Sequence, residues 1–194
     1  MLLMLVVVVA IAISLFYFSK ISIDSIKIDK LADTRQALRT AKQSLLNYAV
    51  LHSGVSGAGT GLGGGDPGEY GYLPCPHITD GDEGKQDTPC GSKHVNSIGY
   101  FPWLSMNIAP LTDSGGNCLW YAVSGSYKNH FYSGLINEDT HGMFQVVDES
   151  GNVVQGATPK DQVVAVIIAP GSVLADQVRT FDSNTLCGAD SANI

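Results

Sequence analysis

An uncharged apolar run from Met1 to Phe18 limits what this chain can fold into more than any other feature. Ser14 and Tyr17 are its only polar interruptions, and a run of this length can cross a bilayer as a helix. It begins without Lys or Arg and ends without small residues before a cleavage site, so we expect it to be retained rather than removed as a signal peptide. The run disfavours a purely cytosolic soluble enzyme.

A second pattern follows the apolar run. From Leu31 onward the apolar residues recur at helical spacing, at positions Leu31, Leu38, Ala41, Leu45, Leu46 and Ala49. This spacing predicts an amphipathic helix that ends near His52. The link from Lys20 to Lys30 fits either continuous helix or a loosened stretch. We therefore expect a membrane-spanning segment over 1–19 and an amphipathic continuation over 20–53.

The segment 54–71 contains nine glycines, which is too many for regular structure and predicts a loop. Gly59, Gly61 and Gly64 match the dinucleotide-binding spacing G-x-G-x-x-G. That motif must leave a strand and enter a helix, whereas this segment leaves a helix and enters a loop. We therefore expect no nucleotide and no other cofactor.

The remaining segment, 72–194, is predicted to form one globular, β-rich domain. Extended candidates are 119–124, 142–147 and 162–169, and 144–154 is typical of a hairpin with its turn at 150–152. Because 163–168 is apolar throughout, we expect that strand to be buried on both faces, with one face under the long helix. The predicted fold class is α+β, with a long N-terminal helix packed on a small antiparallel sheet.

Four cysteines lie after the apolar run: Cys75, Cys90, Cys118 and Cys187. An even number in a loop-rich domain favours two disulfides in an oxidising compartment. Of the three possible pairings, Cys75–Cys90 with Cys118–Cys187 is preferred, since the first closes a local loop and the second ties the C-terminal segment to a strand.

Zinc binding is an alternative to disulfide bonding, and calcium binding is a separate candidate. Cys75 and Cys90, with His77 and His94, supply enough ligands for tetrahedral zinc, although Cys-x-His is an unusual chelate and exported thiols tend to oxidise. Asp80, Asp82 and Glu83 are calcium candidates, although they lack the twelfth ligand of an EF-hand loop. The preferred prediction is that neither metal binds.

Catalytic motifs and nucleic-acid-binding features are both missing from the sequence. Gly-x-Ser-x-Gly, Ser-x-x-Lys and His-Glu-x-x-His do not occur, and the five histidines are scattered along the chain. The formal charge of −7 comes without a basic stripe for phosphates. Aromatic clusters at 100–104 and 120–121 are expected to pack in the core rather than bind a partner. We therefore expect neither an enzyme nor a nucleic-acid-binding protein.

The order of these segments resembles the type IV pilins and pseudopilins. Five segments resemble the prepilin-type minor pilins in particular: Leu45-Leu46-Asn47-Tyr48-Ala49, Gly71-Tyr72-Leu73-Pro74-Cys75-Pro76 with Asp80-Gly81, Gly99-Tyr100-Phe101-Pro102-Trp103, Leu119-Trp120-Tyr121-Ala122-Val123, and Val164 to Gly171 followed by Gln177-Val178-Arg179. Two features depart from the family. No basic leader ending in Gly precedes the apolar run in this sequence, which fits either a processed form or a late start. Met4 or Leu5 stands where major subunits have a glutamate at the fifth mature position.

The resemblance implies a structural role without turnover. It implies a minor pilin or pseudopilin of a type IV pilus or a type II secretion-like filament, held in the bacterial inner membrane with its globular domain in the periplasm before assembly. The partners would be other pilin or pseudopilin subunits. The assembly helix would begin with Leu2, Leu3, Met4, Leu5, Val6, Val7, Val8 and Val9. The alternative is a membrane-anchored periplasmic binding module that does not polymerise, and an anchored hydrolase is a more distant one.

Overall fold

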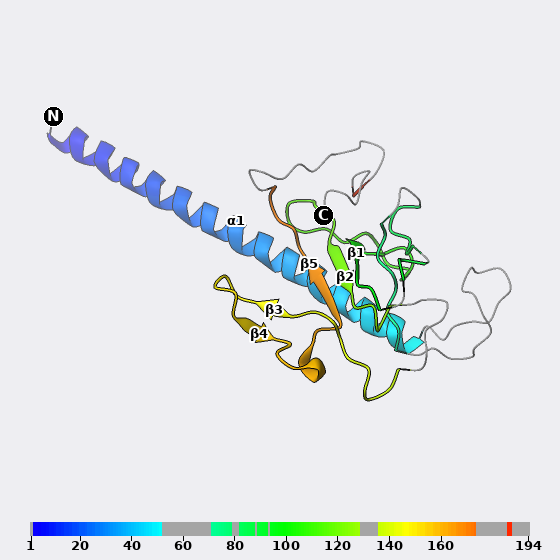
Figure 1. Ribbon diagram of the computed structural model, residues 1–194. Coiled ribbons are helices and arrows are strands. Elements are labelled where there is room, and N and C mark those ends of the chain that lie inside the picture. The colour runs from blue at the N-terminus through cyan, green and yellow to red at the C-terminus, as the bar shows by residue number, and fades with distance from the viewer. Residues whose placement is uncertain are drawn as a thin grey trace.

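The protein has an α+β fold in which one long helix carries a small, disulfide-bonded β domain (Figure 1). The computed structural model describes residues 2–51, 71–78, 82–87, 89–92, 94–128, 136–173 and 186–187, with side chains from residue 27 onward. The elements are α1 (Leu2–Leu51), β1 (Ser97–Tyr100), β2 (Trp120–Val123), β3 (Val146–Val147), β4 (Val153–Gln155), the 3-10 helix η1 (Pro159–Asp161) and β5 (Ala165–Ile168). This confirms the predicted fold class at the level of one helix, antiparallel sheets and two disulfides.

Helix α1 is continuous over its 50 residues, which corresponds to a rod of about 75 Å at 1.5 Å per residue. The link from Lys20 to Lys30, for which the sequence left two alternatives, is therefore helical. Figure 1 shows the N-terminal part of α1 extending away from the domain and its C-terminal part crossing the β elements. The helix ends at Leu51, one residue before the expected end.

The C-terminal half of α1 packs on the sheet through a narrow face. Ala41, Leu45 and Tyr48 are buried, and Ala41 and Leu45 belong to the main hydrophobic core. Two leucines expected on the apolar face, Leu31 and Leu46, are instead exposed. Sequence spacing identified the helix but made its buried face too wide, because the sheet covers only the residues that point directly at it.

Strand β2 is the centre of a three-stranded antiparallel sheet with the order β1-β2-β5. Its residue Tyr121 lies opposite Gly99 of β1 and Ile167 of β5. Tyr121, Val123 and the preceding Leu119 are fully buried. The central position of β2 gives it a hydrogen-bonded neighbour on each side, so this strand forms the middle of the core.

The prediction that 163–168 is buried on both faces is wrong. Strand β5 lies at an edge of the three-stranded sheet, its residues are half-buried, and Ile168 is exposed. The expected contact with the long helix is present, since α1 packs against β5. An apolar run looks the same in sequence whether its strand is central or at an edge, since only strand pairing sets that position.

Strand β1 is not among the strands predicted from the sequence, and only its last residue, Tyr100, belongs to the aromatic cluster at 100–104. The following residue, Phe101, is buried and meets the ring of Tyr121 edge-to-face, with centroids 5.9 Å apart and ring planes at 79°. This contact confirms the expected core role for these two aromatics. Gly99 is needed in β1 because an added Cβ would lie 2.3 Å from the carbonyl oxygen of His77.

The predicted hairpin is confirmed as β3 and β4, which pair antiparallel. In its turn, Asp148 N–H donates to Asn152 O at 2.9 Å and Gly151 N–H donates to Asp148 O at 3.0 Å. Gly151 has φ +82°, which disfavours residues with a side chain. Figure 1 shows this hairpin as a separate element outside the three-stranded sheet.

Several sequence expectations concern residues beyond those described. The Gly59-Gly61-Gly64 motif, most of the predicted loop 54–71, and Asp80 lie outside them, as do the side chains of the assembly helix from Leu2 to Val9. Among the residues that the structure describes, no helix has both the length and the apolar character needed to cross a membrane.

Candidate functional site

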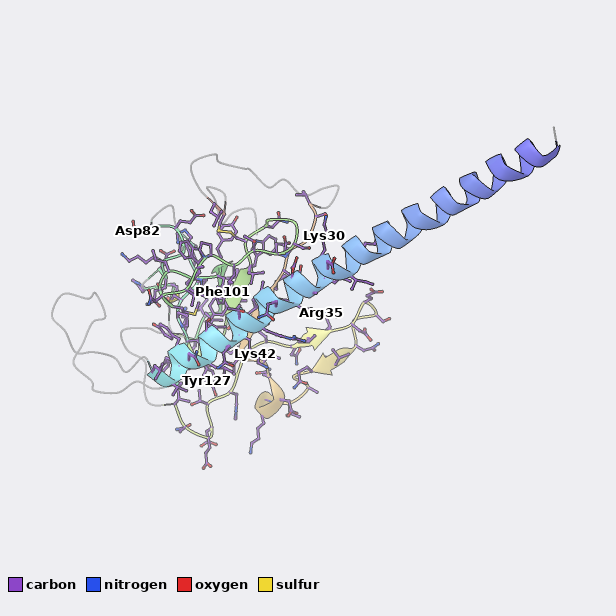
Figure 2. The ribbon with its side chains drawn as sticks, turned by 180° about the vertical axis from the view of Figure 1, so that it is seen from behind. Lys30, Arg35, Lys42, Asp82, Phe101 and Tyr127 are labelled. Atoms are coloured by element: carbon purple, nitrogen blue, oxygen red, sulfur yellow. A yellow bond between two sulfur atoms is a disulfide. The ribbon has the colours of Figure 1, made fainter. Side chains whose placement is uncertain are left out.

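The exposed side of α1 carries a row of cations. Arg35, Arg39 and Lys42 are spaced by four and three residues, so they share one face of the helix. We call these three residues the basic stripe. By helical spacing, Asp29 and Asp33 lie on a different face of α1 from the basic stripe. Figure 2 labels Arg35 and Lys42 along α1.

The basic stripe has no acidic partner within the described residues. The one ion pair among them joins Lys85 Nζ to the Asp82 carboxylate at 3.1 Å, and both residues lie outside α1. Between residues 27 and 51 the helix contains five basic and two acidic side chains, whereas residues 52–194 contain five basic and fifteen acidic ones. The helix is thus positively charged and the remainder of the chain strongly negative.

An apolar groove of about 660 Å³ runs beside the basic stripe, between α1 and β5. Helix α1 contributes Leu38, Lys42, Leu45, Leu46 and Ala49 to its lining, and the β5 side contributes Val164, Ala165 and Ile167. Gly71, Leu73 and Tyr127 complete it. We call this the α1–β5 groove. Its volume is in the range of established ligand and peptide sites, and sequence periodicity gave no signal for it because its two walls come from distant segments.

A second concavity has several polar side chains in its lining. It has a volume of about 420 Å³, and His94, Asp139 and His141 are among its lining residues. His94 adopts φ +63°, an uncommon conformation for a residue other than glycine. The structure therefore brings together two of the five histidines that the sequence left scattered. We call this concavity the polar cleft.

Both disulfides have the preferred pairing. Cys75 bonds to Cys90 across 15 residues, and Cys118 bonds to Cys187 across 69 residues. Cys75 and Cys90 are bonded to each other, so in this structure neither is a thiolate that could bind zinc. His77, the third of its proposed ligands, is buried with Nδ1 3.1 Å from the carbonyl oxygen of Lys85.

The calcium candidates have different roles in the structure. The Asp82 carboxylate pairs with Lys85, and the Glu83 carboxylate accepts the backbone N–H groups of Leu186 and Cys187. Glu83 thus attaches the C-terminal cysteine to the loop. Among the described residues, no three His, Cys, Asp or Glu side chains are arranged to hold a metal ion.

A buried lysine lies behind the first disulfide, and sequence reasoning did not identify it. Lys128 is 1% exposed, and its Nζ donates to Cys90 O at 2.8 Å and to Ser97 Oγ at 3.4 Å. Burial lowers the pKa of Lys128, because the charged ammonium is poorly solvated there. Because Lys128 Nζ bonds both to Cys90 and to Ser97 of β1, it holds the loop that contains Cys90 against β1.

Comparison of the chain with protein-family models, with curated proteins and with solved structures finds no match.

Proposed function

We propose that this protein is a minor pilin or pseudopilin, a structural subunit of a type IV pilus or type II secretion-like filament. The length of α1 carries the proposal: a single 50-residue helix extends beyond a small domain that covers only its C-terminal part. Such a rod has a long segment available for packing against equivalent helices. The uncharged sequence from Met1 to Phe18 suits both a lipid bilayer and the centre of a helical bundle.

In the proposed mechanism the N-terminal half of α1 holds the subunit in the inner membrane and then moves into the filament. Both surroundings are apolar, so the transfer has little hydrophobic cost, and helix packing and domain contacts select the neighbours. The two disulfides keep a small domain folded outside the reducing cytoplasm. The protein would act by assembly, with the globular domain in the periplasm before incorporation.

The polar cleft favours a second candidate, a membrane-anchored periplasmic binding module that does not polymerise. The cleft collects hydrogen-bonding side chains around a volume that would hold a small molecule. This candidate requires only the anchor and the domain, and it predicts that the chain stays in the membrane whether or not filaments form.

The two candidates differ in where the full chain is found. In filament-forming bacteria, a photo-crosslinking residue replacing Val8 should link the chain to other subunits in sheared filaments. The same residue replacing Lys160, which is exposed on η1, is the matched control and should give no helix-to-helix product. Recovery of the protein only from washed membranes, while filaments assemble normally, would rule out the filament role and favour the binding module.

A further inference from the structure

The β3–β4 hairpin exposes four valines, and no third strand pairs with it within the described structure. Val146, Val147, Val153 and Val154 are all exposed, with Val154 at 60%. An isolated two-stranded hairpin is marginally stable, and exposed apolar strands tend to pair with other surfaces. The hairpin therefore has the character of an interaction element.

The tip of this hairpin is acidic. Asp148 and Glu149 begin its turn, between the apolar strands. The Asp148 carboxylate is occupied, since it accepts the N–H groups of Ser150 and Asn152 at 2.9 Å each. Glu149 is exposed and makes no such bond to any residue that the structure describes. It is the carboxylate available to a partner.

The α1–β5 groove has the complementary composition. Its walls are apolar and Leu46 in it is 49% exposed. Among the described residues that line it, Lys42 alone is charged. Arg35 and Arg39 continue the positive charge along the same helix face. Opposite charges on two apolar surfaces steer their encounter and fix their register.

We propose that the β3–β4 hairpin of one copy docks in the α1–β5 groove of a second copy, with Glu149 against Lys42. Within one chain the hairpin does not occupy the groove. No hairpin residue lines the groove, and no ion pair joins Asp148 or Glu149 to the basic stripe. This inference is independent of the filament role, because it concerns only the domain and the part of α1 packed on it.

The interface is heterologous, since a hairpin on one copy meets a groove on the next. Each added copy then presents its own groove or hairpin, so association is not limited to a dimer unless the arrangement closes into a ring. The species expected with rising concentration are therefore dimers followed by larger oligomers. An association that ends at an isologous dimer would contradict this geometry.

A charge-exchange experiment tests the contact with the full chain in detergent. Lys42→Glu and Glu149→Lys should each weaken self-association, measured by sedimentation velocity, by at least tenfold. A mixture of the two variants should regain association, because each groove then meets a tip of opposite charge. The reversed groove meets the reversed tip, and the unchanged groove meets the unchanged tip. Lys27→Glu and Glu138→Lys, which change exposed charges outside both surfaces, are matched controls and should associate like the original chain.

Apolar variants give a second measure. Val154→Ser and Leu46→Ala, at exposed positions of the hairpin and the groove, should both weaken association while circular dichroism shows an unchanged fold. Unchanged association in both charge variants, or a mixture that stays as weak as its components, would overturn the proposal. The proposal would also be overturned if the full chain stayed monomeric at concentrations high enough for one detergent micelle to hold several copies.

Discussion

Asp113 and Asp148 occupy equivalent positions in two turns with the same hydrogen-bond pattern. Each begins a five-residue segment that ends in asparagine, and its N–H donates to that residue's carbonyl, at 2.8 Å for Asn117 and 2.9 Å for Asn152. Each carboxylate also accepts the backbone N–H of its asparagine at 2.9 Å. The same local sequence pattern thus forms the same turn twice.

The two turns differ in what lies against them. Asp113 is buried and also accepts the N–H of Gly171 at 2.8 Å, while the Asn117 side-chain amide donates to Gly171 O at 3.0 Å. This turn therefore holds the segment that follows β5. Asp148 lies at the exposed hairpin tip with bonds only inside its own turn among those described.

Replacing these two aspartates should have unequal effects. Asp113→Ala leaves the N–H groups of Gly115, Asn117 and Gly171 without their acceptor, and we expect a loss of about 1.5–3 kcal/mol in the free energy of unfolding. Asp148→Ala is the matched control and should reduce stability much less, since water reaches its turn. Urea denaturation with the disulfides intact measures both, and equal losses would contradict the anchoring role of Asp113.

Acid should destabilise the domain partly through Asp113. Burial raises the pKa of its carboxyl, but the hydrogen bonds from Asn117, Gly115 and Gly171 outweigh this effect, so its pKa lies below the usual value. A carboxyl with a lowered pKa stabilises the fold above its unfolded pKa, and this stabilisation is lost as pH falls through the folded pKa. The urea concentration at the midpoint of unfolding of the original chain should therefore decrease as the pH is lowered below about 4. Asp113→Asn should have a smaller dependence in this window, and an identical pH profile would show that other groups control it.

Neighbouring leucines on α1 should respond differently to truncation. Leu45 is 5% exposed and lies in the main core, whereas Leu46 is 49% exposed. Leu45→Ala should lower the free energy of unfolding by about 2–5 kcal/mol, because it leaves a cavity. Leu46→Ala should change it by less than about 0.5 kcal/mol. Thermal unfolding measures the stability of both variants. A larger loss in Leu46→Ala than in Leu45→Ala would contradict this packing of the helix.

Loss of the long-range disulfide should destabilise the chain more than loss of the local one. Chain-entropy arguments assign about 4.4 kcal/mol to the loop of 69 residues closed by Cys118–Cys187 and about 3 kcal/mol to the loop of 15 residues closed by Cys75–Cys90. We therefore compare the double variant C118S/C187S with C75S/C90S by urea denaturation. A larger loss in C75S/C90S would show that the contacts around Cys90, including Lys128, outweigh the loop entropy.

Features with local causes were predictable from the sequence alone. The hairpin turn at 150–152 depends on a glycine with positive φ and on an aspartate that bonds to residues two and four positions later. The helix up to Leu51 depends on the spacing of apolar residues and on the glycines that follow. Each of these interactions joins residues close in sequence, so composition and spacing are sufficient evidence.

The tertiary structure decided the features that join distant segments. It placed β2 rather than the apolar strand β5 at the centre of the sheet, and it exposed Leu31 and Leu46 on a helix whose leucines look equivalent in sequence. It also attached Glu83 to Cys187, and it formed the groove between α1 and β5. Hydrophobic patterning indicates which residues favour burial. Strand order and helix placement determine which of them are buried, because a small sheet covers only part of the apolar side chains.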